Sequence, residues 1–182
     1  TSSAATLTNV AWTAQGKYGT GLTFDGTNSY GQISPPATPL RLTTAMTVEV
    51  WMNATTLPTG WHTLMSRQFG TGGADSWGLF TRGTTVEFWT NSTDFIAAPV
   101  TSGTWTHVAG VLDGTAVRLY VNSMLVATGT TTVPIPNDDN EVVIGASSNG
   151  NPLISEFFNG TLDEIRVYNR ALSQAEIQTD MN

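Results

Sequence analysis

Apolar and polar residues alternate with a period of two along most of this sequence, and this pattern constrains the fold more than any other feature. Val86 and Phe88, for example, alternate with Glu87 and Trp89. Successive side chains of a β-strand point to opposite faces of a sheet, so such segments predict strands with one face against a core. A period of about 3.6 residues, typical of a helix, occurs only near the C-terminus. The alternation therefore predicts an all-β fold.

The expected strands are short, and turn residues separate them. They are Gly21–Phe24, Tyr30–Ile33, Met46–Met52, His62–Arg67, Trp77–Thr81, Thr85–Thr90, Thr104–Leu112, Ala116–Val121, Met124–Thr130, Glu141–Ile144 and Leu162–Tyr168. Asp113-Gly114 and Asn122-Ser123 each separate two of these segments, as in β-hairpins. Many short antiparallel strands at this spacing predict a sandwich, a barrel or a jelly roll.

Three segments depart from the alternation. Gly70–Ser76 is rich in glycine and Pro134–Asn140 in proline and aspartate, so both are expected to be loops. Ser173–Asp180 is expected to form one short helix, because Ser173 can act as the N-cap and Glu176 follows three residues later as its capping-box partner. Since the 182 residues contain no repeat and no interdomain linker, we expect one domain over residues 1–182, excised from a larger protein.

Composition narrows the possible partners. The 14 acidic and 7 basic residues give a net charge of −7, which disfavours nucleic acid because affinity for its backbone comes from clustered lysine and arginine. The lack of cysteine excludes disulfides and cysteine-based zinc sites. No apolar run approaches the ~20 residues of a membrane helix, so membrane insertion is not expected. Only 12% of the residues are charged and threonine is abundant, and this composition suits a secreted or cell-surface domain of a bacterium.

A set of short motifs follows one another in a recognisable order. They are Gly16–Gly19 (GKYG), Leu22–Gly26 (LTFDG), Met46–Trp51 (MTVEVW), Trp105–Ala109 (WTHVA), Leu119–Asn122 (LYVN), Ile144–Gly145 (IG), Phe158–Tyr168 (FNGTLDEIRVY), Arg170–Ser173 (RALS) and Glu176–Ile177 (EI). Together they resemble the laminin-G-like jelly rolls of the concanavalin-A-like lectin/glucanase superfamily. The resemblance implies two antiparallel sheets, one concave and one convex, that recognise glycans or proteins rather than catalyse reactions.

The sequence departs from the family pattern in two places. Family members begin with a further strand and an Asp- and Gly-rich loop before the Gly16–Gly19 motif, so the first strand here is expected to be abbreviated or cut. Ser123 stands where a glycine usually follows the Leu119–Asn122 motif, so Asn122 or Ser123 must adopt a strained turn conformation.

Calcium is the expected cofactor, with Asp163 as its first ligand. Alternation places Asp163 on the same face as Ile165 and Val167, where its charge needs compensation, and a Ca²⁺ ion would supply it. The resemblance implies further ligands from the loop after an early strand, here Asp25 and Asn28. The alternatives are that Asp25 only forms a turn and that Asp163 forms a salt bridge with Arg166 or a neighbouring residue.

The expected ligand-binding residues are tryptophans and charged residues of the central strands. If Phe88 faces the core, then Trp89 and Glu87 share an outer face, where a sugar ring could stack on the indole while the carboxylate accepts hydrogen bonds from hydroxyls. The remaining candidates are Arg67, Asp75, Trp77 and Arg82. The alternative is that all are ordinary half-buried sheet residues.

Catalysis is not expected. Related enzymes carry a Glu-x-Asp-x-x-Glu or similar motif on a concave strand, whereas here Glu49 and Glu87 are each followed two residues later by tryptophan. The favoured function is therefore a non-catalytic, calcium-stabilised module that binds carbohydrate or a cell-surface glycan, beside neighbouring domains of a parent protein. The alternatives are a structural or adhesive spacer without a small ligand and, third, a glycan-cleaving enzyme.

Overall fold

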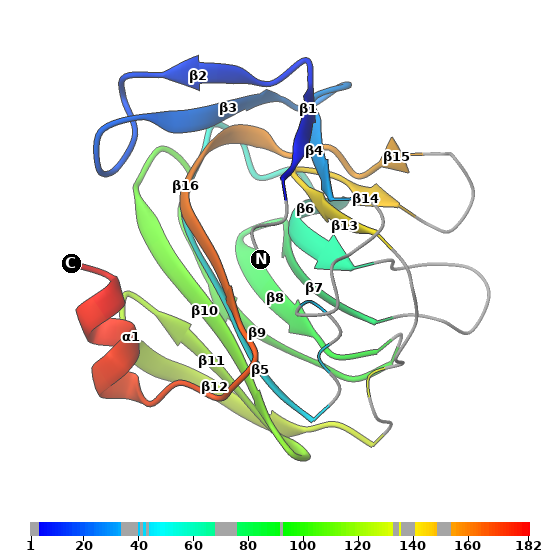
Figure 1. Ribbon diagram of the computed structural model, residues 1–182, viewed down its shortest axis with the longest axis vertical. Helices are drawn as coiled ribbons and strands as arrows, with labels where there is room; N and C mark the ends of the chain where they lie inside the picture. The colour runs from blue at the N-terminus through cyan, green and yellow to red at the C-terminus, as the bar shows by residue number, and fades with distance from the viewer. Residues whose placement is uncertain are drawn as a thin grey trace.

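The computed structural model describes residues 4–33, 40, 42, 44–67, 76–91, 93–132, 135, 141–148 and 154–182, and these residues form two large antiparallel sheets (Figure 1). The first sheet has the order β1 (Thr6–Thr8), β4 (Tyr30–Ile33), β13 (Val142–Ile144), β6 (Trp61–Arg67), β7 (Trp77–Arg82), β8 (Thr85–Trp89) and β9 (Phe95–Pro99). The second sheet has the order β12 (Met124–Thr130), β11 (Ala116–Val121), β10 (Thr106–Asp113), β5 (Ala45–Ala54), β16 (Asn159–Tyr168), β3 (Gly21–Asp25) and β2 (Ala11–Thr13).

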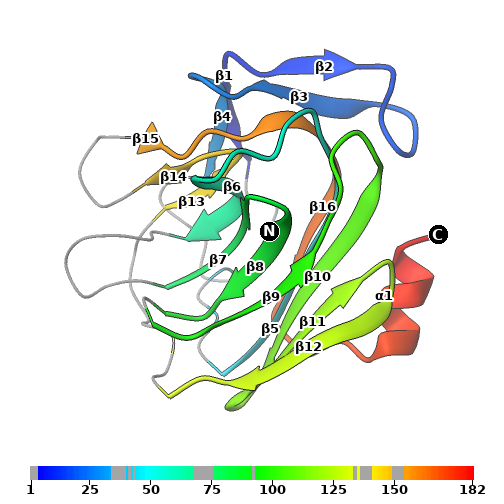
Figure 2. The same ribbon diagram turned by 180° about the vertical axis from the view of Figure 1, so that it is seen from behind.

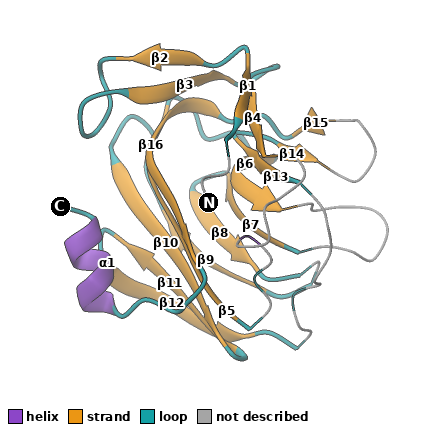
Figure 3. Ribbon diagram, in the orientation of Figure 1, coloured by secondary structure: helices purple, strands orange, loops and turns teal. Residues whose placement is uncertain are grey.

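Two further elements complete the described structure. A small two-stranded sheet joins β14 (Ser147–Ser148) to β15 (Ile154–Ser155), and α1 spans Gln174–Asp180 (Figure 3). Ser173 caps α1 in a capping box with Glu176, as the sequence predicted. No described helix is long and apolar enough to cross a membrane. The prediction of an all-β, two-sheet antiparallel jelly-roll sandwich with one short helix is confirmed.

The core lies between the inner faces of the two sheets. On β8, Val86 and Phe88 are fully buried and belong to one cluster with residues of β5, β10 and β16. The Phe88 ring lies against Gly110 of β10 so closely that a Cβ atom at Gly110 would come within 2.5 Å of it. This close approach orients β8, because Phe88 points inward and its neighbours Glu87 and Trp89 must point outward.

The hairpin between β11 and β12 forms its turn although Ser123 stands where family members usually have glycine. Asn122 and Ser123 both have positive φ angles, 49° and 61°, as a type I′ turn requires. The Asn122 side chain supports the turn, because its Oδ1 accepts a hydrogen bond from the backbone N–H of His107 at 3.0 Å. Asparagine tolerates this conformation better than most residues, which explains how the turn forms without glycine.

The prediction that Asp163 shares a face with Ile165 and Val167 is wrong. The pairing of β16 with β5 shifts register between Asp163 and Arg166, and Glu164 has a φ of 49°. This β-bulge adds one residue and so reverses the alternation. Leu162 and Val167 face the core, whereas Asp163 lies opposite Trp51 on the outer face.

The outer face of the second sheet is partly covered by the C-terminal segment. Figures 1 and 2 show α1 lying beside β10, β11 and β12. Ile177 of α1 and Leu172 before it pack against Ala109, Val111 and Tyr120 in a second apolar cluster. No helix of the described part of the chain covers β6 to β9 of the first sheet, and the candidate site lies there.

Candidate functional site

An aromatic and charged cluster occupies the outer face of β6 to β9. Its members are Trp61, Arg82, Glu87, Trp89 and Phe95, which we call the aromatic–carboxylate cluster. The sheet registers bring them together, since Trp61 lies opposite Arg82 and Trp89 lies opposite Phe95. The cluster therefore results directly from the pairing of four consecutive strands.

The Glu87 carboxylate is the centre of the cluster. The indole N–H groups of Trp89 and Trp61 donate to its Oε2 at 2.8 and 3.3 Å, and the Arg82 Nε donates to Oε1 at 2.8 Å. A second guanidinium nitrogen of Arg82 also lies 2.8 Å from Oε1. Glu87 is only 1% exposed, so four donors hold a buried charge in place. These contacts fix the orientation of both indole rings.

The rings present apolar surface to solvent. Trp89 stacks on Phe95 with ring centroids 4.2 Å apart and an angle of 12° between the planes, and it meets Trp61 edge to face at 6.1 Å. Trp61 is 42% exposed and Phe95 is 41% exposed, whereas Trp89 lies half-buried between them. The Arg82 guanidinium lies 5.2 Å from the Trp61 ring centroid, within the range of a cation–π contact.

This arrangement can bind a ligand that presents an apolar face to the exposed rings. Exposed aromatic rings held by buried hydrogen bonds lose little conformational entropy on binding. The paired Arg82 and Glu87 carry no net charge together, so the site does not select for a strongly charged ligand. A sugar ring meets these requirements, because its C–H face can stack on an indole or phenyl ring.

The structure brings together only some of the residues predicted to bind a ligand. Trp89, Glu87 and Arg82 lie in the aromatic–carboxylate cluster, although Glu87 is buried and already accepts hydrogen bonds from its neighbours rather than facing a ligand. Arg67 and Trp77 are fully buried on the core side, and their predicted place on the binding face is wrong. Asp75 lies outside the described residues.

The burial of Arg67 and Trp77 has two causes. A bulge between Thr63 and Met65 reverses the alternation of β6, so Trp61 faces outward and Arg67 faces the core. Trp77 lies an odd number of residues from Arg82 on β7, so the two cannot share a face.

Two residues of the cluster were missing from the predicted site. Trp61 is an exposed residue at the start of β6, and Phe95 begins β9, a strand that the sequence analysis did not predict. The segment Phe95–Pro99 shows no alternation, which hid the strand. The turn residues that precede Phe95 were the available signal.

The three predicted calcium ligands do not form one site. Asp25 lies opposite Asn159, and Asp163 lies four residues further along β16, a separation of about 13 Å at the rise of a strand. Among the described residues, no group of three or more histidine, aspartate or glutamate side chains could hold a metal ion. The predicted ligand set therefore does not fit a single ion.

Each of these carboxylates has a structural partner. Asp25 Oδ1 accepts hydrogen bonds from the backbone N–H groups of Asn28 and Thr27, which hold the pKa of Asp25 well below its usual range, and from the backbone N–H and hydroxyl of Ser29. Asp163 accepts from the backbone N–H of Tyr18 at 2.8 Å and from that of Glu164 at 2.9 Å. Asp163 thus fastens the early glycine-rich motif to the bulge in β16.

A second titratable cluster lies on the outer face of the second sheet. Glu49 and His107 are both buried, with His107 Nε2 3.8 Å from Glu49 Oε2. Burial and the nearby Asp180 raise the pKa of Glu49 to about 7, against the partly opposing effect of Arg166. Burial and the positive charge of Arg166 lower the pKa of His107 to about 4. Both groups are therefore neutral between these values.

These two groups are expected to affect stability in opposite directions as pH rises. The native state keeps a proton on Glu49 up to about pH 7, whereas the unfolded chain loses it near 4.5, so this group lowers the free energy of unfolding as pH rises through that window. His107 is protonated below about pH 6.5 in the unfolded chain but only below about pH 4 in the native state. This group therefore raises the free energy of unfolding as pH rises from about 4 to 6.5.

Two substitutions separate these effects. Relative to the wild type, the free energy of unfolding of Glu49→Gln should rise with pH between about 4.5 and 7, and that of His107→Gln should fall with pH between about 4 and 6.5, each by up to about 1 kcal/mol per pH unit. Urea denaturation across this range measures both slopes. Equal slopes in the two variants would contradict the assignment.

Comparison with known proteins identifies the family of this chain and structures with a similar fold. Residues 25–178 match the model of the concanavalin A-like lectin/glucanases superfamily. No curated protein sequence matches the chain significantly. The fold is similar to that of the binding domain of Paraclostridial Mosquitocidal Protein 1, with a TM-score of 0.78 at 13% identity over 99% of this chain and 47% of that one.

Two other similar structures contain a bound sugar. Domain 4 of AbnA, a GH43 extracellular arabinanase from Geobacillus stearothermophilus, was solved with arabinotriose; its TM-score is 0.75 at 19% identity, over 98% of this chain and 88% of that one. The ligand-binding domain of botulinum neurotoxin serotype D was solved with N-acetylneuraminic acid. Its TM-score is 0.74 at 13% identity, over 98% of this chain and 45% of that one.

The chain spans about half the length of the toxin domains that it matches. At these identities the likeness shows a shared fold. The family match covers most of the chain and confirms the resemblance drawn from its motifs. The chain belongs to the concanavalin A-like lectin/glucanase superfamily.

Proposed function

We propose that this chain is a non-catalytic module that binds carbohydrate on the outer face of β6 to β9. The observation that carries the proposal is the aromatic–carboxylate cluster, in which Trp61 and Phe95 are each more than 40% exposed around a buried Glu87. Large exposed apolar groups that are held rigidly are typical of binding sites. Arabinotriose and N-acetylneuraminic acid in two structures of the same fold support carbohydrate as the ligand class.

The proposal favours binding over glycan cleavage. A glycosidase needs a carboxylic acid that can reach the glycosidic bond, whereas Glu87 is buried and its two oxygens accept hydrogen bonds from two tryptophans and an arginine. Its role is to position the rings. Similar domains in an extracellular enzyme and in toxins support a place in a secreted or cell-surface protein.

A glycan array tests the proposal. We expect the wild type to retain a defined group of glycans and the double variant Trp61→Ala/Phe95→Ala to lose them. Retention of nothing by the wild type would favour the alternative of a spacer domain that orients its neighbours. Release of reducing ends from polysaccharides that the protein binds would instead support the alternative of a glycan-cleaving enzyme.

Calcium stabilisation remains a prediction, although Asp25 and Asp163 do not share a site. An ion that binds only the native state at about 100 times its Kd adds about 2.7 kcal/mol to the free energy of unfolding. We therefore expect protein loaded with calcium to melt at a higher temperature than the same protein with EDTA. An unchanged midpoint would contradict the prediction and favour a structural role for both carboxylates as hydrogen-bond acceptors.

A further inference from the structure

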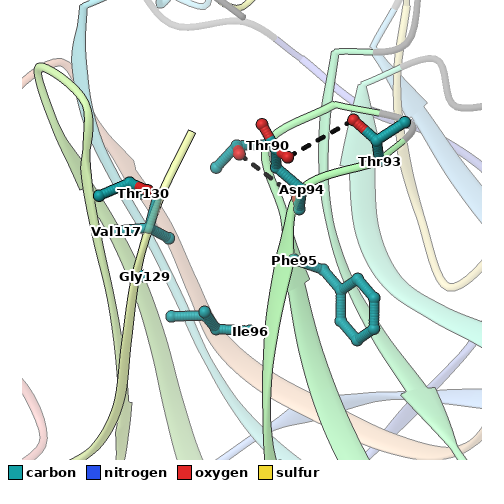
Figure 4. A pocket seen from close by; sticks show the side chains of 8 residues that line it. All are labelled: Thr90, Thr93, Asp94, Phe95, Ile96, Val117, Gly129 and Thr130. Atoms are coloured by element: carbon teal, nitrogen blue, oxygen red, sulfur yellow. Dashed lines mark hydrogen bonds between the residues drawn. The ribbon is translucent and has the colours of Figure 1, made fainter. Parts of the chain in front are cut away.

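A pocket lies where the edges of the two sheets meet. It lies between the β9 edge of the first sheet and the strands β11 and β12 of the second (Figure 4). Its volume is about 160 Å³, which is the space of about five water molecules and about half of the smallest pockets that hold drug-sized ligands. The pocket therefore suits one small ring.

The walls of the pocket differ in chemistry. Ile96 and Val117 supply apolar surface, and Thr90, Thr93 and Thr130 stand among the polar lining residues. Gly129 contributes a wall without a side chain. A sugar ring has the same combination of an apolar C–H face and a rim of hydroxyl groups.

Asp94 supplies the charged acceptor of the pocket. Its Oδ2 accepts strong hydrogen bonds from the Asn91 side chain at 2.8 Å and from the backbone N–H and hydroxyl of Thr132 at 2.6 and 2.7 Å. Among the described residues, its Oδ1 accepts only a long bond of 3.5 Å from the Thr93 hydroxyl (Figure 4). The carboxylate is thus fixed by one oxygen, and the other can accept a hydrogen bond from a ligand hydroxyl.

The pocket adjoins the aromatic–carboxylate cluster at Phe95, the first residue of the edge strand β9. Phe95 is a lining residue of the pocket, but its ring lies on the opposite face of β9 from Ile96, where it stacks on Trp89 with ring centroids 4.2 Å apart (Figure 4). We infer that the pocket is a second carbohydrate subsite, which takes a terminal sugar ring of a glycan that passes over the start of β9 to the Phe95 ring. This inference rests on the proposed function, because it extends the same ligand beyond the cluster and requires an oligosaccharide rather than a single sugar.

NMR titrations with single-ring probes test the subsite separately. The probes are methyl glycosides of glucose, galactose, mannose and arabinose, and N-acetylglucosamine, each added alone. We expect at least one probe to shift the backbone amide signals of Thr93, Asp94 and Gly129. The indole N–H signals of Trp61 and Trp89 report the cluster in the same spectra. Failure of the cluster to respond and failure of the pocket to respond are therefore distinguishable.

Blocking the pocket provides the control. Thr130 is exposed at the pocket rim, so Thr130→Trp should fill the pocket and abolish the amide shifts; Thr130→Leu is a smaller block if tryptophan disturbs folding. Thr128→Trp is the matched control, because Thr128 is exposed on the same strand but does not line the pocket. The inference is overturned if no probe shifts the pocket signals, or if the shifts persist in both Thr130 variants.

Discussion

Replacing Arg82 by methionine is expected to lower the free energy of unfolding by about 3 kcal/mol. The substitution keeps most of the aliphatic part of the side chain but leaves the Glu87 carboxylate, which is 1% exposed, without its positive partner. Removing one partner of a buried ion pair typically costs about 3 to 5 kcal/mol; solvent screening at Arg82, whose side chain is 41% exposed, and the two indole donors that remain place the value at or below the lower end. Chemical denaturation measures the loss.

The partner substitution is expected to cost less. Glu87→Gln removes the buried charge and keeps an acceptor, and Arg82, whose side chain is 41% exposed, can still be solvated, so a loss of about 1 to 2 kcal/mol is expected. The double variant Arg82→Met/Glu87→Gln should be more stable than Arg82→Met alone, since no buried charge is left unpaired. A change of less than about 0.5 kcal/mol in Arg82→Met, as at an ordinary surface position, would refute this role for Glu87.

Replacing Trp61 by alanine is expected to weaken binding of the best glycan from the array by about 10- to 100-fold. Loss of an aromatic residue that dominates a binding site costs about 1 to 3 kcal/mol of binding free energy, and 10- to 100-fold corresponds to about 1.4 to 2.8 kcal/mol within this range. Trp61 is the most exposed tryptophan of the cluster, and its ring is already oriented by Glu87. Isothermal titration calorimetry measures the change in Kd.

The chain offers a matched control for this substitution. Trp12 is 68% exposed on β2, which is in the other sheet, and it makes none of the ring contacts of the cluster. Trp12→Ala should therefore bind as the wild type does. Equal losses in Trp12→Ala and Trp61→Ala, or an unchanged Kd in Trp61→Ala with a native circular dichroism spectrum, would contradict the proposed site.

Strand alternation predicted the sheet faces wherever a strand is regular. On β8, Val86 and Phe88 face the core and Glu87 and Trp89 face outward, as expected. The pattern failed where a strand contains a bulge. Arg67 and Asp163 each lie beyond an extra residue that reverses the alternation, and no local feature of the sequence marks that residue.

The burial of Glu87 could not be predicted from its own strand. Its donors come from three strands, and which of them meet depends on sheet registers that long-range pairing sets. The position of Phe95 depends on the same registers, because β9 carries no alternation of its own. The sequence thus indicated the binding face through Trp89, and the structure was needed to find the exposed rings beside it.

The indole N–H signals of the six tryptophans give the most direct test of carbohydrate binding at this face, because they report separate parts of the molecule. During an NMR titration with the glycan retained most strongly on the array, the signals of Trp61 and Trp89 should shift together with one Kd. The signal of Trp12, on the other sheet, should not move, nor should that of Trp77 in the core. Shifts confined to Trp12, or no shift at Trp61 and Trp89 at saturation, would contradict carbohydrate binding by the aromatic–carboxylate cluster.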